Sequence, residues 1–264
     1  MITGPIRQDG PIDHIIKKSG TPTMGGVIII IGIISSTLLW ADLTNIYIWT
    51  LMFVSLSLGG LGLLDDVLKI KFKNSQGLKS KYKFVGQLII SSLTLLILIK
   101  FSDHNYLYDL YFPFFKNLIW HMGVFFIPFG LFVIIGASNA VNLTDGLDGL
   151  ATVPVMLVAL SFTLISYIVG NTIFSDYLQI QYIPDVGELS IFGGSIVGAC
   201  LGFLWYNAPP AKIFMGDTGS LSLGGSLAAI AIIVKHEIVL AIIGGLFVLE
   251  TVSVIIQVIS FKLT

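Results

Sequence analysis

Cysteine and charge are both scarce in this chain of 264 residues. Cys200 is the single cysteine, so neither a disulfide framework nor a cysteine-based zinc site can be built, and we expect a small core residue there. Charged residues make up 11% of the chain and the net charge is −1, which gives no indication of a nucleic-acid partner. Hydrophobic residues reach 55% and mean hydropathy is +0.93, which excludes a soluble domain and indicates an integral membrane protein.

Eight apolar stretches are long enough to cross, or nearly cross, a bilayer. They cover approximately residues 24–40, 46–64, 84–99, 122–137, 152–169, 191–206, 221–234 and 238–259. Paired glycines inside several of them allow close helix packing. We therefore predict an all-α polytopic membrane protein, with about eight transmembrane helices in a single integral membrane domain over residues 1–264. The first 26 residues contain no apolar core, so we expect no cleavable signal peptide.

Basic residues predict the orientation of these helices. Eleven of the fourteen lysines and arginines fall on alternate loops, which the positive-inside rule assigns to the cytoplasm. These cytoplasmic loops cover about residues 1–23, 65–83, 138–151, 207–220 and 260–264. On the opposite side, aromatic residues crowd the segment 106–120, and we interpret this segment as a belt that lies along the membrane interface.

Five carboxylates lie at the ends of apolar stretches on the predicted cytoplasmic side, where ionised groups are candidates for function. Asp65 and Asp66 are adjacent, and like charges repel unless a cation or a proton joins them. Such a pair can hold a divalent ion, or one member can act as a base whose pKa the other tunes. The alternative is a solvated helix end that faces nearby lysines.

A second polar motif combines two amides with two carboxylates. Asn139, Asn142, Asp145 and Asp148 repeat every three residues, so on a helix they share one face. Such a stripe suits a sugar, a nucleotide base or a metal ion. The alternative is a helix start, with Asn142 or Thr144 as the N-cap and the two acids in the first turn.

The third motif is FMGDTGS, followed by an apolar stretch. It places Gly216, Thr218, Gly219 and Ser220 at a helix N-terminus, which favours a phosphate. Asp217 would repel that phosphate unless a hard cation joined them, and Mg²⁺ prefers one or two carboxylates plus substrate phosphates. Together the three motifs indicate phosphoryl transfer.

The chain also resembles the phospho-N-acetylmuramoyl-pentapeptide transferase family over nearly its whole length. In the family's order and spacing, the resemblance is carried by GPIDHIIKKSGTPTMGG (10–26), LGLLDDVLK (61–69), NAVNLTDGLDGLA (139–151), FLWYNAPPAKIFMGDTGSLSLGG (203–225) and LETVSVIIQV (249–258). The wider superfamily of polyprenyl-phosphate N-acetylhexosamine-1-phosphate transferases shares the Asp-Asp and Asn/Asp motifs. The forms GTPTMGG and FMGDTGS are more similar to the muramoyl-pentapeptide branch.

This resemblance implies an enzyme of peptidoglycan synthesis in the bacterial inner membrane. Such an enzyme transfers phospho-N-acetylmuramoyl-pentapeptide from UDP to undecaprenyl phosphate, forms lipid I and UMP, and requires Mg²⁺. The resemblance also implies a homodimer of ten-helix subunits with a cytoplasmic active site, in which the eight apolar stretches here correspond to the middle eight helices.

The resemblance also implies roles for individual residues. Asp217 is the expected magnesium ligand, and Asp65 and Asp66 form the catalytic acidic pair, with Asp65 the better candidate to deprotonate or orient the lipid phosphate. The expected substrate-binding residues are Lys18, Thr23, Lys81, Asn139, Asn142, Asp145, Asp148, Asn207, Gly216, Ser220 and Gln257.

Several alternatives stay open at the level of sequence. Transfer can occur in one step or through a covalent aspartyl intermediate. The family continues into a histidine-rich loop and a final helix after the position of Thr264, so we expect reduced or absent activity from this stretch alone. An inactive truncated copy or a related transferase of the superfamily is an alternative. A transporter would place acids at mid-bilayer and show an inverted repeat, and neither feature is visible.

Overall fold

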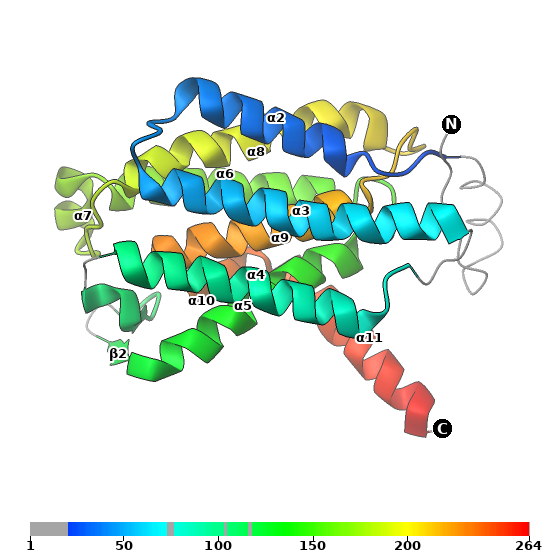
Figure 1. Ribbon diagram of the computed structural model, residues 1–264. Helices are drawn as coiled ribbons and strands as arrows, with labels where there is room; N and C mark the ends of the chain where they lie inside the picture. The colour runs from blue at the N-terminus through cyan, green and yellow to red at the C-terminus, as the bar shows by residue number, and fades with distance from the viewer. Residues whose placement is uncertain (1–20, 73–76, 103–104, 116–117, 264) are drawn as a thin grey trace.

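The computed structural model describes residues 21–72, 77–102, 105–115 and 118–263, and it is almost entirely helical (Figure 1). The elements are α2 (Gly26–Trp40), α3 (Ile46–Phe72), α4 (Ser80–Phe101), η1 (Asn105–Tyr108), β1 (Asp109–Tyr111), β2 (Ile119–His121), η2 (Gly123–Phe125), α5 (Phe126–Thr144), α6 (Thr152–Val169), α7 (Thr172–Leu178), η3 (Val186–Glu188), α8 (Leu189–Asn207), α9 (Gly216–Ile233), α10 (Glu237–Ile243) and α11 (Gly245–Leu263). The predicted class, an all-α polytopic membrane protein, is confirmed.

Six helices in the described ranges are long and apolar enough to cross a membrane, namely α3, α4, α5 with η2, α6, α8 with η3, and α9. The pair α10 and α11 makes a seventh span if both helices belong to one crossing. Helix α2 is apolar but has only 15 residues, fewer than the roughly 20 of an upright span. The predicted number of eight crossings is therefore not established, although every predicted apolar stretch forms helix.

The last apolar stretch is not one continuous helix, as the sequence pattern predicted. It is broken at Gly244, and the two parts, α10 and α11, meet at an angle of 78°. Two consecutive glycines weaken a helix interior because they lose the most backbone freedom on folding. Helix α11 therefore leaves the bundle and projects beside it (Figure 1).

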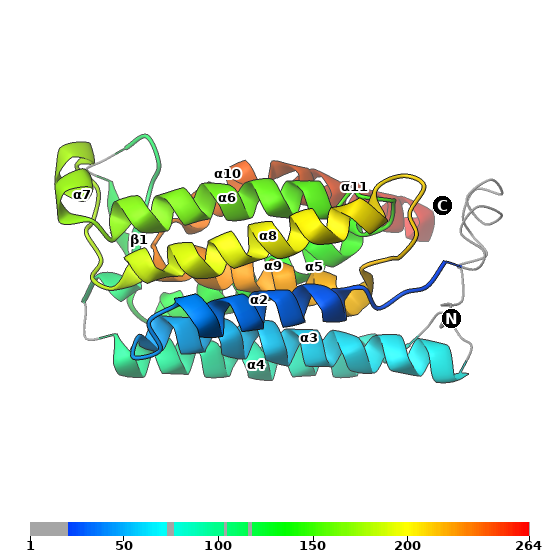
Figure 2. The same ribbon diagram turned by 90° about the horizontal axis from the view of Figure 1, so that it is seen from above.

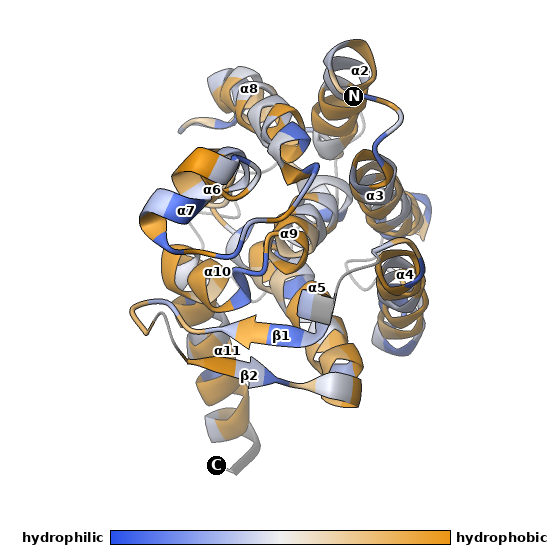
Figure 3. Cartoon of the chain, turned by 90° about the vertical axis from the view of Figure 1, so that its left-hand side faces the viewer, coloured by the Kyte–Doolittle hydropathy of each residue, from blue (hydrophilic) through white to orange (hydrophobic). Residues whose placement is uncertain are grey.

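Helix α9 lies at the centre of the bundle, and its apolar window is 89% buried (Figure 3). Its small residues allow the neighbouring backbones to approach, because there is little side chain to separate them. A Cβ atom on Gly26 of α2 would overlap the backbone of Gly219, and the hydroxyls of Ser55 in α3 and Ser222 lie 2.9 Å apart. The central helix is thus in backbone contact with α2 and in close side-chain contact with α3.

The end of the bundle that carries α7 also carries a short antiparallel ribbon, in which β1 pairs with β2 from Asp109↔His121 to Tyr111↔Ile119 (Figures 2 and 3). The segment interpreted as an aromatic belt thus contains two short strands that the sequence did not predict. Lys235 is buried against the same end with 1% exposure, and its ammonium donates to Glu237 at 2.6 Å and to the carbonyl of Leu107 at 3.0 Å. This pairing satisfies a charge that burial would otherwise make costly.

Candidate active site

Three carboxylates meet at the end of the bundle opposite the ribbon. Asp65 and Asp66 extend from α3 and Asp217 extends from the first turn of α9, and one oxygen of each lies within 4.8 Å of the others. Asp65 and Asp66 are 2% and 3% exposed. Gly62 makes this meeting possible, because a Cβ atom at that position would overlap the carbonyl of Asp217. The close contact between the two helices therefore brings the first and third sequence motifs together.

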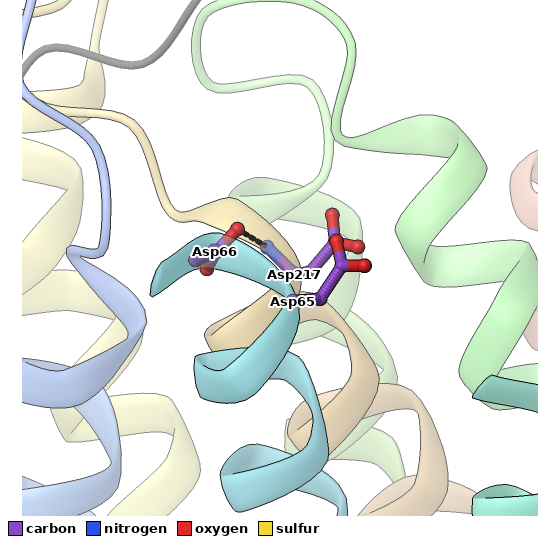
Figure 4. Close-up of side chains that lie close together, drawn as sticks. All are labelled: Asp65, Asp66 and Asp217. Atoms are coloured by element: carbon purple, nitrogen blue, oxygen red, sulfur yellow. Dashed lines mark hydrogen bonds between the residues drawn. The ribbon is translucent and has the colours of Figure 1, made fainter. Parts of the chain in front are cut away.

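The three carboxylates do not point to one common centre (Figure 4). Asp65 and Asp217 turn their oxygens toward each other, whereas Asp66 reaches the backbone nitrogen of Asp217 from the other side. Neighbouring residues on a helix face different directions, so adjacent positions in the sequence give two separate environments.

Two lysines supply positive charge to the carboxylates. The Nζ atom of Lys69 lies 2.5 Å from Oδ2 of Asp65 and 3.1 Å from Oδ2 of Asp217. The Nζ atom of Lys83, from α4, lies 2.5 Å from the same oxygen of Asp217. The predicted site residues include neither lysine and instead include Lys81, whose side chain is exposed. The spacing of Lys69, four residues after Asp65, was an available signal, whereas the position of Lys83 depends on how α4 packs.

Asn142 connects these groups from the last turn of α5. With its amide nitrogen toward α9, Asn142 donates to Oδ1 of Asp217 at 3.1 Å and to Oγ of Ser220 at 2.8 Å, and its oxygen accepts from Lys83 at 3.2 Å. One turn earlier, Asn139 donates to Oε1 of the buried Gln87 at 2.9 Å. Two amides of the second motif thus join α4, α5 and α9 around Asp217.

The two carboxylates of the second motif lie beyond the end of α5, because Thr144 is the last helical residue. Both the predicted four-residue stripe and the alternative helix start are therefore wrong at this point. Gly149 has φ +71°, and such a conformation turns the chain away from a helical path. Asp145 accepts the amide N–H of Gly216 at 3.2 Å, and Asp148 accepts that of Ala211 at 3.0 Å.

The N-terminus of α9 begins at Gly216, as the sequence predicted. Its amides are already bonded, however, and this contradicts the expectation of an open phosphate site. The N–H of Gly216 donates to Asp145, and the N–H groups of Asp217 and Thr218 donate to Asp66 at 3.2 Å and 3.0 Å. Carboxylates of this chain thus take the place that a phosphate would occupy.

Asn207 is 2% exposed and joins two loops. Its oxygen accepts from the N–H of Gly149 at 3.2 Å and from the hydroxyl of Thr152 at 2.7 Å, and its amide donates to the carbonyl of Ile213 at 3.0 Å. All three partners belong to the chain itself, so Asn207 holds the two loops together. The substrate contact predicted for it stays a prediction.

The remaining predicted residues lie in different places. Thr23 borders the α9 start, since a Cβ atom on Gly216 would lie 3.1 Å from its hydroxyl oxygen. Gln257 is exposed on α11 and donates to Ser253 at 3.4 Å, so the described contacts do not connect it with the carboxylates. Lys18 lies outside the described residues.

The donor set fits a hard divalent cation. Asp65 and Asp217 offer carboxylate oxygens, the ligands that Mg²⁺ prefers. The ammonium of Lys69 lies 2.5 Å and 3.1 Å from these oxygens, so the structure itself places positive charge between them. The cluster can therefore hold a metal ion.

The structure is thus a bundle of membrane helices with acidic and amide side chains gathered at one end. The family model described as glycosyl transferase family 4 matches residues 48–235, and signature 1 of phospho-N-acetylmuramoyl-pentapeptide-transferase matches residues 18–30. The chain belongs to the phospho-N-acetylmuramoyl-pentapeptide-transferase family.

The similarity extends along the whole chain. It is 65% identical over 263 residues to the phospho-N-acetylmuramoyl-pentapeptide-transferase of Pelagibacter ubique (strain HTCC1062), which covers 100% of this chain and 73% of the relative. It is 58% identical over 260 residues to the transferase of the same name from Rickettsia prowazekii (strain Madrid E), covering 98% of this chain and 72% of the relative. The family resemblance seen in the motifs is confirmed.

Proposed function

We propose that this protein transfers phospho-N-acetylmuramoyl-pentapeptide from UDP to undecaprenyl phosphate, forming lipid I and releasing UMP. The observation that carries the proposal is the contact of Asp65 and Asp217 with Lys69 at one end of a membrane bundle. Both substrates bring phosphates to this reaction, and a site that combines cations with carboxylates is suited to join them. The relatives that bear this activity in their name support the assignment.

The reaction is an in-line exchange at phosphorus. An oxygen of the lipid phosphate attacks the phosphorus attached to the sugar, the bond from that phosphorus to the bridging oxygen breaks, and UMP leaves with the electron pair. We assign Asp65 to accept or orient the proton of the lipid phosphate. Lys69 and Lys83 stabilise the negative charge that develops between the two phosphates, because they are fixed there before reaction.

Asp217, with Asp65 beside it, is our proposed site for Mg²⁺. When bound, the ion supplies electrostatic neutralisation of the diphosphate. We further assign the nucleotide sugar to the side formed by Asn139, Asn142 and Ser220, next to the loops that Asp145, Asp148 and Asn207 hold in place. Roles for Lys18, Thr23, Lys81, Gly216 and Gln257 stay predictions.

We favour a single step over a covalent intermediate. Asp217 accepts from two lysines, and such pairing lowers the reactivity of a carboxylate as a nucleophile. Incubation with the nucleotide sugar alone should then release no UMP and leave no phosphorylated protein. A burst of UMP equal to the protein concentration would instead establish the covalent route.

The test of function uses purified protein in detergent with undecaprenyl phosphate, Mg²⁺ and UDP-N-acetylmuramoyl-pentapeptide. We expect UMP and lipid I to appear together, and Asp217→Asn to abolish both. Transfer from UDP-N-acetylglucosamine in place of the muramoyl substrate would assign the chain to a related transferase of the superfamily and overturn the proposal.

We place the protein in the bacterial inner membrane with this site facing the cytoplasm, since the lysine-rich segments lie at the same end as the carboxylates. The homodimer implied by the resemblance remains a prediction, and light scattering of the protein–detergent complex tests it.

A further inference from the structure

We infer that Asp66 is a positioning residue, which holds the first turn of α9 and thereby Asp217, rather than a ligand of the metal or a base. The inference rests on the proposed function, and it separates two adjacent aspartates that the sequence treats as one pair.

Both oxygens of Asp66 are already bonded to α9. Oδ1 accepts the N–H of Asp217 at 3.2 Å, and Oδ2 accepts the N–H of Thr218 at 3.0 Å and its hydroxyl at 2.7 Å. The first amides of a helix have no partner within the helix, and they favour a negative charge. Asp66 therefore caps α9 from another helix, a role that an N-terminal side chain usually fills.

The side chain of Asp66 is buried and closely surrounded by other atoms. The residue is 3% exposed, and a Cβ atom on Gly216 would lie 2.7 Å from its Oδ2. Figure 4 shows its carboxylate on the far side of the α9 start from the facing oxygens of Asp65 and Asp217. If Asp66 bound the same cation as those two residues, its oxygens would have to share that cation with the amides and the hydroxyl of α9 that they already accept from.

Asp65 has a different set of partners. Its Oδ1 accepts the N–H of Leu78 at 2.7 Å, and its Oδ2 contacts Lys69. These contacts join α3 to the segment before α4 and to Lys69, whose Nζ atom lies 2.5 Å from Oδ2 of Asp65 but 3.8 Å from Oδ1 of Asp66. The two neighbours thus have separate tasks, because successive side chains on a helix diverge.

A double-mutant cycle tests this inference. The variants are Asp66→Asn, Thr218→Val and their combination, with Thr218→Ser as the matched control that retains the hydroxyl. Turnover and KM for the nucleotide sugar are measured in detergent, and Mn²⁺ affinity is measured by electron paramagnetic resonance without substrate. Thr218→Val removes one of the three contacts that Asp66 makes with α9, so its effect should not multiply with that of Asp66→Asn.

We expect Asp66→Asn to lower kcat roughly tenfold to a hundredfold, as loss of a group that orients a metal ligand does, with KM changed by less than about twofold. Thr218→Val removes one hydrogen bond and should lower kcat about fivefold. Thr218→Ser keeps the hydroxyl and should be faster than Thr218→Val, and the double variant should be no slower than Asp66→Asn. Mn²⁺ binding should weaken far more in Asp217→Asn than in Asp66→Asn.

The inference is wrong if Asp66→Asn loses Mn²⁺ binding as completely as Asp217→Asn, or if Thr218→Val turns over at the unmodified rate. If the unmodified protein transfers no sugar phosphate, the proposed function fails separately. In that case the Mn²⁺ affinities still decide the role of Asp66, and thermal unfolding without metal should show lower midpoints for both Asp66→Asn and Thr218→Val.

Discussion

Two lysines contact Asp217, one held by its position on α3 and the other by the packing of helices. Lys69 stands four residues after Asp65 on the same helix, so its contact with that carboxylate is local. Lys83 comes from α4 and reaches Asp217, which is 134 residues further along the chain. Only the packing of α4 and α9 on α3 distinguishes Lys83 from Lys81 and Lys79, which share its sequence surroundings.

Replacement of these lysines should therefore have unequal effects. Lys83→Met removes a fixed cation beside Asp217 and should lower kcat on the order of a hundredfold, the loss typical of one electrostatic donor. Lys81→Met is the comparison, because the sequence assigned Lys81 to the substrate, whereas its exposed side chain leads us to expect a change within about twofold. The rate of UMP release measures kcat for both variants. A larger loss in Lys81→Met than in Lys83→Met would favour Lys81, the residue that the sequence predicted.

At the scale of elements, the positions of the helix ends determine which groups the side chains of the second and third motifs contact. The second motif ends α5 rather than beginning a helix, and its carboxylates bond to the amides of Gly216 and Ala211. The third motif begins α9 as predicted. Periodicity predicts helix but places its ends poorly, because a terminus depends on which partners satisfy the unpaired backbone groups.

The contact between α3 and α9 should be sensitive to a single methyl group. In Gly62→Ala the added Cβ would overlap the carbonyl of Asp217, so the two backbones must separate. We expect a lower thermal unfolding midpoint, a loss of stability of about 2–3 kcal/mol, and a marked loss of UMP release.

Gly60→Ala provides the control for that prediction, because it lies two residues away on the same helix with no heavy atom within 4 Å of the added Cβ. It should leave activity unchanged and stability equal or slightly higher, since alanine favours helix over glycine. Equal loss in both variants would show that the close contact is not what matters.

At the scale of the whole molecule, the lysine and carboxylate cluster lies at one end of the bundle, and α7 and the β-ribbon lie at the other end (Figures 1 and 2). Tyr177 in α7 is 83% exposed at one end, and Lys212 is exposed beside the α9 start at the other. The chain has one cysteine, Cys200, which is buried in the core as the sequence predicted. Maleimide labelling of cysteines introduced at Tyr177 and Lys212 can therefore be measured without a signal from Cys200.

The predicted orientation places these two positions on opposite sides of the membrane. In spheroplasts, a membrane-impermeant maleimide should label Tyr177→Cys and should label Lys212→Cys only after the membrane is opened. Labelling of Lys212→Cys in closed spheroplasts would place the carboxylates outside and exclude a cytoplasmic nucleotide sugar as substrate.

The sequence by itself determined the class of this protein, its apolar helices and the three polar motifs, because hydropathy and local residue types decide those features. It also identified the family. Only the tertiary structure decided that α9 starts against α3, that Lys83 rather than Lys81 contacts Asp217, and that Asp65 and Asp66 face different surroundings. The contact of α9 with α3 depends on the close backbone approach at Gly62 and on the bonds from Asp66 to α9, between segments about 150 residues apart. No local pattern in the sequence records which distant groups such contacts bring together.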